Sequence, residues 1–191
     1  MTELFSSSEL IDLIEKVVAG ERLCFEDGVR LFHSNDLLAI GYMADKIRQR
    51  KHGKKVYFGG DSQSTATQFY DPIENIEERV VRLLRLRELQ DQTGGYHTFA
   101  PVPVIPKTTA LEQQVAANTT GFEDIKVLSI ARILLDNFDH VKASWMHIGP
   151  KLAQVSLEFG VDQLDGESTP DMTVEELVHI VKAAGYEPVG E

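Results

Sequence analysis

The segment 145–151 combines residue types that suit a small ligand site. Its sequence, WMHIGPK, runs from the end of an expected strand directly into the first turn of an expected helix. A helix N-terminus presents free backbone N–H groups that attract an anion, and the ammonium group of Lys151 adds positive charge. The segment therefore predicts an anion site with four ligand-binding candidates, Trp145, His147, Gly149 and Lys151. The alternative interpretation is that Trp145 and Ile148 are core residues and that Lys151 is solvated.

Three more residues are expected at the same edge of a sheet. Tyr70, Asp71 and Ile105 follow expected strands, and parallel α/β sheets bind ligands at the carboxyl ends of their strands. Tyr70 therefore joins His147 among the ligand-binding candidates. No catalytic residue is predicted from these positions.

Cysteine and histidine, the usual metal ligands and nucleophiles, show no motif. The six histidines form no HExxH or HxH arrangement, so no metal site is predicted and they are expected at the surface or at strand ends. Cys24 has Arg22 as its one nearby cation in the sequence, which favours a structural thiol over a nucleophile. Because Cys24 is the only cysteine, the chain cannot form an internal disulfide, a multi-cysteine zinc site or an iron–sulfur cluster.

Length and net charge limit the class of protein and the kinds of partner that the chain can have. The chain has 191 residues, 42% of them apolar, which suits one globular domain. Its 19 basic and 30 acidic side chains give a net charge of −11, which argues against nucleic acids and anionic membranes as partners. The acidic, amphipathic start is not typical of a secretory signal, and no run of about 18 apolar residues is present. A cytoplasmic protein without a membrane span is therefore expected.

The elements that must position these residues fall into two parts, expected to form one compact domain. Residues 1–55 predict a helical segment, and residues 56–191 predict a partial β/α barrel with a carboxy-terminal helix. Capping residues predict helix starts at Asn75, Thr120 and Thr173, each followed three residues later by Glu. Strands are expected at 56–58, 65–70, 96–104 and 141–146, helices at 10–18, 25–32, 37–51, 75–90, 120–137, 150–159 and 173–185, and a long loop at 106–120.

The amount of chain limits the fold. A closed (β/α)8 barrel takes about 250 residues, and residues 56–191 suffice for about four of its units. The expected fold is therefore α/β, with a half TIM-type barrel or a small open parallel sheet. A half-barrel would leave sheet edges near 56–58 and 141–146 unpaired and an apolar interior open. This predicts self-association, a partner chain, or packing of the amino-terminal helices on an open sheet.

Two blocks of the chain resemble one enzyme family. GERLCFEDGVRLFHSNDLLAIGYMADKIRQRKHGKKVYF (20–58) is similar to the amino-terminal region of aminodeoxyfutalosine synthase. Residues 66–105 and 120–166 resemble its late barrel, with the specific phrases EERVVRLLRLRELQDQTGG and ARILLDNFDHVKASW. Relatives that make cyclic dehypoxanthine futalosine or the deazaflavin precursor share a weaker version. The resemblance implies a radical S-adenosylmethionine enzyme of the futalosine route to menaquinone.

The chain departs from this family at one junction. In the family, the strand ending in VYF leads into a loop with CxxxCxxC, whose cysteines bind a four-iron four-sulfur cluster that in turn binds S-adenosylmethionine. Here VYF is followed by GGDSQSTATQFY, which resembles barrel strand six, and that strand ends in Asp71-Pro72 where the family usually has Gly-His. The chain is therefore expected to bind no cofactor, and to be unable to carry out radical chemistry alone.

Several hypotheses about function remain open at this point. The first is a shortened aminodeoxyfutalosine synthase-like protein, for which enzymatic activity is left undecided. The alternative is a non-catalytic module that binds a small aromatic or nucleoside-like carboxylate, or that completes a barrel by self-association or with a partner chain. A deletion in the gene is a further alternative.

Overall fold

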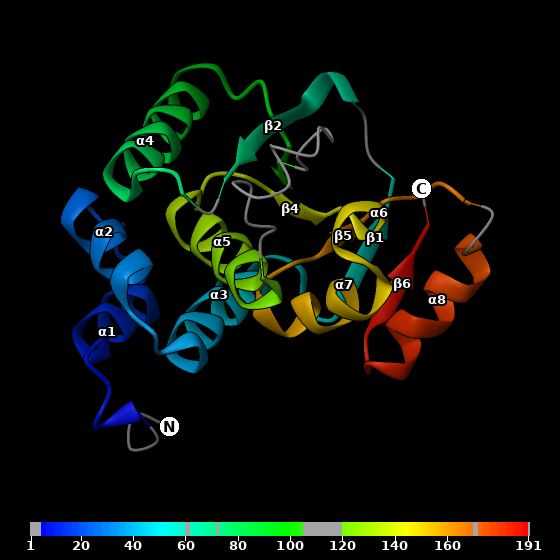
Figure 1. Cartoon of the computed structure of the whole chain (residues 1–191), viewed down its shortest axis with the longest axis horizontal. Coiled ribbons are helices and arrows are strands. Elements are labelled where there is room, and N and C mark those ends of the chain that lie inside the picture. Colours follow the sequence, from blue (N-terminus) through cyan, green and yellow to red (C-terminus); the bar gives the residue numbers. More distant parts are fainter. Residues whose placement is uncertain (1–4, 60–61, 72, 105–119, 170–171, 191) are drawn as a thin grey trace, which may run out of the picture.

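The amino-terminal helices pack in a layer with two later helices. The computed structural model describes residues 5–59, 62–71, 73–104, 120–169 and 172–190. Near the positions predicted from sequence lie α1 (Ile11–Ala19), α2 (Phe25–His33) and α3 (Leu37–His52). These pack against α4 (Ile76–Thr93) and α5 (Gly121–Leu134), with α1 on α3, α2 on α4 and α3 on α5 (Figure 1). Because α5 also contacts β3 and β4, it connects this layer to the sheet, and all of its residues from 124 to 134 are buried.

Local capping explains where the longer helices begin. The side chains of Asn75, Thr120 and Thr173 each accept a hydrogen bond from the backbone N–H group three residues later. The glutamates after Thr120 and Thr173 return the bond to the backbone of the capping residue, so α5 and α8 (Val174–Ala183) both begin with a capping box. These three predicted helix starts are confirmed.

The sheet is open, parallel and flanked by helices, which confirms the expected fold class. Within the described residues it has six strands in the order β2-β3-β4-β5-β1-β6, and every pairing is parallel. The strands are β1 (Lys55–Phe58), β2 (Thr65–Tyr70), β3 (Thr98–Pro103), β4 (His140–Ala143), β5 (Gln163–Leu164) and β6 (Glu187–Val189). Strands β5 and β6 were not predicted, since two or three residues carry no readable alternation.

The predicted positions of the sheet edges are wrong. Strand β1 lies between β5 and β6, and β4 lies between β3 and β5, so neither is an edge. The edges of the described sheet are instead β2 and β6. The two unpredicted strands account for this difference, because each pairs with β1.

The two faces of the sheet differ in polarity. Val56, Val141 and Leu164 belong to an apolar cluster that includes residues of α8 and of α7 (Pro150–Ser156). On the opposite face Lys142 is paired in register with Gln163, whose Oε1 accepts a hydrogen bond from Oγ1 of Thr98. The expectation of an apolar interior is therefore wrong at these positions, where polar side chains replace it.

The segment between β4 and α7 differs from its prediction. The strand expected at 141–146 ends at Ala143, and Trp145–Ile148 form a short helix, α6. Helix α7 then begins at Pro150 and is followed by a 3-10 turn, η4 (Leu157–Phe159). Most of the predicted loop at 106–120 lies outside the described residues, and the predicted division near residue 55 stays a prediction. No helix in the described part of the chain has both the length and the apolar character needed to cross a membrane.

Candidate functional site

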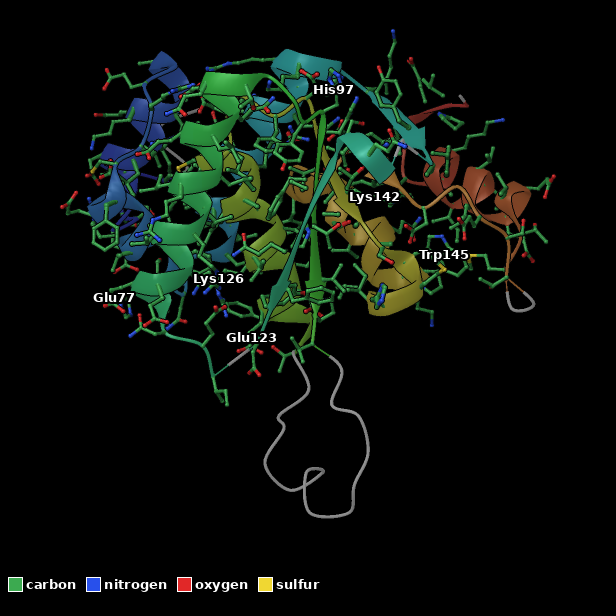
Figure 2. All side chains as sticks on the ribbon, turned by 90° about the horizontal axis from the view of Figure 1, so that it is seen from above. Glu77, His97, Glu123, Lys126, Lys142 and Trp145 are labelled. Carbon is green, nitrogen blue, oxygen red and sulfur yellow. The ribbon has the colours of Figure 1, made fainter. Side chains whose placement is uncertain are left out.

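The carboxyl ends of β4 and β5 lie side by side at one edge of the sheet, paired through Ala143 and Leu164. Asp165 follows β5 directly, and its Oδ1 lies 3.0 Å from Nζ of Lys142 in β4. Trp145 begins α6 shortly after β4, so it and Lys142 come from adjoining elements (Figure 2). Trp145 packs in the apolar cluster with Val141 and Leu164, on the other face of the sheet from Lys142, so the alternative interpretation of Trp145 as a core residue is confirmed. This edge therefore carries an ammonium group, a carboxylate and an indole, here called the edge site (Lys142, Trp145 and Asp165).

Two atoms of the edge site are buried without a hydrogen-bond partner among the described residues. They are Nε1 of Trp145 and Oδ2 of Asp165, and both residues are 5% exposed. An unpaired buried polar group costs about 1–3 kcal/mol. A further partner that accepts from the indole, or one that donates to the carboxylate, would remove that cost. Each of the two atoms can therefore form one more hydrogen bond.

The other predicted site residues have different surroundings. The side chain of His147 is exposed, and its Nδ1 lies 2.6 Å from Oγ of Ser144 in the preceding turn. Gly149 has a positive φ of 82° and precedes Pro150 at the start of α7, while Lys151 is exposed. Nothing in these contacts tests whether they bind a ligand, so their role stays a prediction.

Tyr70 points into the core on the α5 side of the sheet. Its hydroxyl donates a 2.6 Å hydrogen bond to Oδ1 of Asp124, and only 4% of the residue is exposed. Burial and the neighbouring Asp124 carboxylate raise the pKa of the Tyr70 hydroxyl. Asp71 accepts a hydrogen bond from the backbone of Ile73, and Ile105 lies outside the described residues. Tyr70 thus connects β2 to α5 through its hydroxyl.

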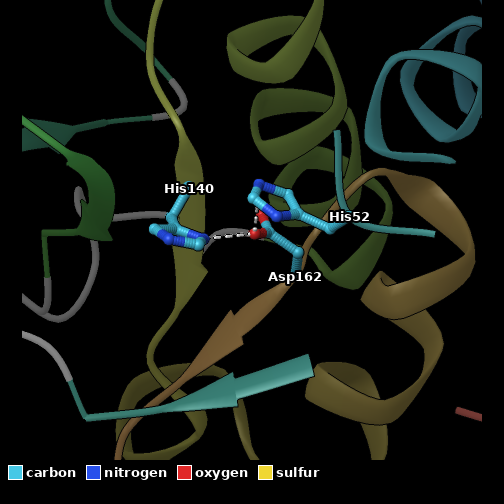
Figure 3. A group of neighbouring side chains, drawn as sticks. All are labelled: His52, His140 and Asp162. Carbon is cyan, nitrogen blue, oxygen red and sulfur yellow. Dashed lines mark hydrogen bonds and ion pairs between the residues drawn. The ribbon is translucent and has the colours of Figure 1, made fainter. Parts of the chain in front are cut away.

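A second group of side chains lies at the amino ends of the strands, and sequence reasoning missed it. His52 ends α3, His140 begins β4, and Asp162 precedes β5. One ligand-type atom from each lies within 4.8 Å of the others (Figure 3). Because the three positions are far apart in the sequence, no spacing motif reveals the group. Their one common feature is that each lies next to the start of a parallel strand, and this becomes visible only once the strands are known.

Arg132 fixes the carboxylate of this group. Its guanidinium is fully buried, forms an ion pair with Oδ1 of Asp162, and donates to the backbone carbonyls of Asp139 and Gly160. Burial opposes ionisation of Asp162, but Arg132 and the hydrogen bond to His140 outweigh it and hold the pKa of the carboxyl below its usual value. Burial also lowers the pKa of His52.

The residues present do not fit an iron–sulfur cluster. Such a cluster is held by three or four thiolates, whereas Cys24 is the only cysteine of the chain. It caps α2, on the helical layer rather than at the edge site. The backbone N–H of Asp27 favours its thiolate, but burial and the carboxylates of Glu26 and Asp27 raise the pKa of the thiol above its ordinary value. Cys24 thus lacks both the companions and the acidity of a cluster ligand.

The arrangement of strands and helices matches solved barrel-like α/β structures. A crystal structure of HydG, a maturase of the FeFe-hydrogenase, superposes with a TM-score of 0.72 at 10% identity, covering 98% of this chain and 77% of that one. Methylornithine synthase (PylB) gives a TM-score of 0.62 at 12% identity, covering 93% and 97% of the two chains. At such low identity these similarities define the fold alone.

Sequence similarity identifies relatives of this chain more specifically than the fold does. Aminodeoxyfutalosine synthase of Thermus thermophilus is 40% identical over 141 residues, which is 66% of this chain and 38% of the relative. The Streptomyces coelicolor aminodeoxyfutalosine synthase is 35% identical, covering 95% of this chain and 51% of the relative. A 5-amino-6-(D-ribitylamino)uracil–L-tyrosine 4-hydroxyphenyl transferase of Methanoculleus marisnigri is 39% identical, covering 73% and 37%. The chain thus spans about two fifths to half of the length of these relatives.

A family model identifies the group to which the chain belongs. The model of the CofH/MqnC C-terminal region matches residues 93–188, which is just over half of the chain. The chain is a member of this family, and the resemblance to aminodeoxyfutalosine synthase is confirmed. The matched region contains all three residues of the edge site.

Proposed function

We propose that this chain is an aminodeoxyfutalosine synthase-like protein of the futalosine route to menaquinone that does not carry out radical chemistry by itself. The observation that carries the proposal is the internal junction after β1, where residues 59–64 lead directly into β2 without a CxxxCxxC motif. The single thiol at Cys24 lies on a different layer of the molecule. We also propose a cytoplasmic location, which fits a chain with a single cysteine and no possible internal disulfide.

Iron binding tests this proposal. After anaerobic reconstitution with ferrous iron and sulfide, we expect the desalted chain to retain far less than one cluster's iron, because one thiolate cannot hold it. The measurements are iron content and visible absorbance, and Cys24→Ser should give the same values as the wild type. A stoichiometric cluster in the wild type would overturn the proposal.

The edge site favours a second candidate function, non-catalytic ligand binding. Its buried indole N–H and carboxylate oxygen lack partners among the described residues, and Lys142 adds a cation that an anionic ligand group can approach. We propose a small aromatic or nucleoside-like carboxylate as the ligand, with His147, Gly149 and Lys151 nearby in the chain. One relative is named for action on L-tyrosine, which is an aromatic carboxylate.

Trp145 provides a direct signal for ligand binding. It is the only tryptophan of the chain, so its fluorescence should change on titration with an aromatic carboxylate, 4-hydroxyphenylacetate, or with a nucleoside carboxylate, adenosine-5′-carboxylate. Calorimetry should give a matching affinity. We expect Lys142→Met and Trp145→Phe each to weaken binding about tenfold, since a hydrogen bond to a charged group contributes about 1.5–3 kcal/mol. Exposed Lys182→Met is the matched control, and flat calorimetric traces with both probes would remove this candidate.

The open edge at β2 supports a proposal about partners. Within the described residues β2 pairs only with β3, and Phe69 on β2 is 65% exposed. Exposed edge strands with apolar side chains pair readily with other chains. We propose that a second copy of this chain covers the edge, a partner chain being the other outcome that co-purification would reveal.

Light scattering coupled to size-exclusion chromatography measures this association. The wild type is expected to elute as a dimer or larger species at micromolar concentration. Phe69→Lys should shift it toward the monomer, because a charged side chain on an edge strand opposes pairing. Leu38→Lys changes an apolar residue on α3 that is 73% exposed, slightly more than Phe69, and should have no such effect. A wild type that is monomeric throughout would contradict the proposal.

A further inference from the structure

We propose that His52, His140 and Asp162 form a binding site for a divalent transition-metal ion such as zinc, at the amino-terminal edge of the sheet. The site lies at the opposite ends of the strands from the edge site, so it is separate from the proposed ligand-binding function. Its three members come from α3, β4 and the segment before β5.

The geometry brings three ligand-type atoms to one point. Oδ2 of Asp162 lies 2.5 Å from Nδ1 of His140 and 3.3 Å from Nε2 of His52. The two imidazole rings, drawn in Figure 3, stack with their centroids 4.6 Å apart. Tyr57 packs edge-on against both. Two imidazole nitrogens and one carboxylate oxygen form a common three-ligand set for zinc and related ions, with water completing the coordination.

The neighbours of Asp162 hold its carboxylate in an orientation that suits metal binding. Oδ1 of Asp162 forms an ion pair with Arg132 and accepts a 3.0 Å hydrogen bond from the backbone N–H of Val141. Oδ2 contacts both histidines. A bound cation would therefore replace the proton of the hydrogen bond between Oδ2 and the His140 ring. Hydrogen-bonded partners of this kind orient metal ligands and are themselves needed for affinity. The carboxylate is thus held in one orientation before any ion binds.

The contacts of the site also define which ion it prefers. A cation at His52 competes with the 2.7 Å hydrogen bond between Nε2 and the backbone carbonyl of Asp139. Arg132 neutralises part of the Asp162 charge, which weakens the attraction for ions that rely on carboxylate oxygens. Imidazole-rich sets suit zinc, cobalt, nickel and copper, whereas magnesium and calcium prefer all-oxygen ligands. We therefore expect zinc and cobalt to bind and magnesium to give no detectable binding.

An ion can reach the site from solvent. The side chains of His52 and His140 are 13% and 20% exposed, whereas Asp162 is fully buried. The histidines thus form the outer wall of the site and Asp162 its floor. Substitution of either histidine removes a ligand at a partly exposed position, which makes these variants better tests than Asp162→Asn.

Titration of the tag-free full chain with zinc alone tests the proposal. Calorimetry should give one equivalent of zinc per chain, and cobalt should produce visible absorption bands. His52→Gln and His140→Asn should each weaken zinc binding at least tenfold, while His33→Gln, on α2 and outside the site, should not change it. The proposal would be overturned if both site variants bound zinc as tightly as the wild type. It would also be overturned if the wild type bound no zinc at a hundredfold molar excess of zinc over the chain.

A measurement on the wild type avoids any dependence on variant folding. In proton spectra, zinc should shift or broaden the ring C–H signals of two of the six histidines. Loss of their titration with pH in the presence of zinc would identify them as ligands. A shift confined to His33, His97, His147 or His179 would place the ion elsewhere and contradict the assignment.

Discussion

Replacing Arg132 by methionine is expected to lower the free energy of unfolding by about 3–5 kcal/mol, because it leaves the carboxylate of Asp162 buried without its main counter-charge. Both side chains are fully buried. Arg132 also donates to the backbone carbonyls of Asp139 and Gly160, so the substitution leaves these acceptors without their charged donor. The loss of one guanidinium therefore disturbs the amino ends of β4 and β5 together.

Urea unfolding followed by circular dichroism measures this effect. The matched control is Arg30→Met, which breaks a surface ion pair with Asp12 in which the two side chains are 43% and 49% exposed. Such exposed pairs contribute about 0–1 kcal/mol. The double variant Arg132→Met/Asp162→Asn should recover part of the loss, since it removes the uncompensated charge. A cost below about 1 kcal/mol for Arg132→Met would contradict a structural role for this ion pair.

Gly160→Ala is expected to cost about 2–5 kcal/mol, from a strained backbone and an overpacked contact. Gly160 ends η4 with a φ of +93°, a conformation that other residues rarely adopt. A Cβ atom there would lie 2.7 Å from Cβ of Ala44 and 3.1 Å from its backbone carbonyl carbon. Because α3 and η4 pack closely here, neither neighbour can move without displacing a helix.

Gly20→Ala separates the cost of backbone strain from the cost of the overpacked contact. Gly20 ends α1 with a similar φ of +82°, but a Cβ atom there would meet nothing within 4 Å. Its expected cost is therefore the backbone strain alone, about 1–2 kcal/mol. Thermal or urea unfolding of both variants gives the comparison. Equal costs for the two substitutions would show that the contact between Gly160 and α3 contributes nothing.

Elements with strong local signals could be predicted from the sequence. The helix starts at Asn75, Thr120 and Thr173 follow from capping residues whose partners lie three residues away, and the strand predicted at 65–70 coincides with β2. The parallel open sheet followed from strand–helix alternation and from the amount of chain available. These features depend on short stretches of chain, which a single sequence contains in full.

Features that depend on pairing between distant segments could not be predicted. Strand β5 has two residues and β6 has three, yet they determine which strands lie at the sheet edges. Asp165 follows the unpredicted β5, so its meeting with Lys142 was not visible in the sequence. The approach of His52, His140 and Asp162 likewise follows from the register of β4, β5 and β1 rather than from any spacing.

We propose that this family member does not generate a radical from S-adenosylmethionine by itself. The most direct measurement is the formation of 5′-deoxyadenosine after anaerobic reconstitution with iron and sulfide, in the presence of a strong reductant and S-adenosylmethionine. With Cys24 as the only thiol, we expect no more 5′-deoxyadenosine than in a sample without protein. Formation of one or more equivalents per chain would contradict it.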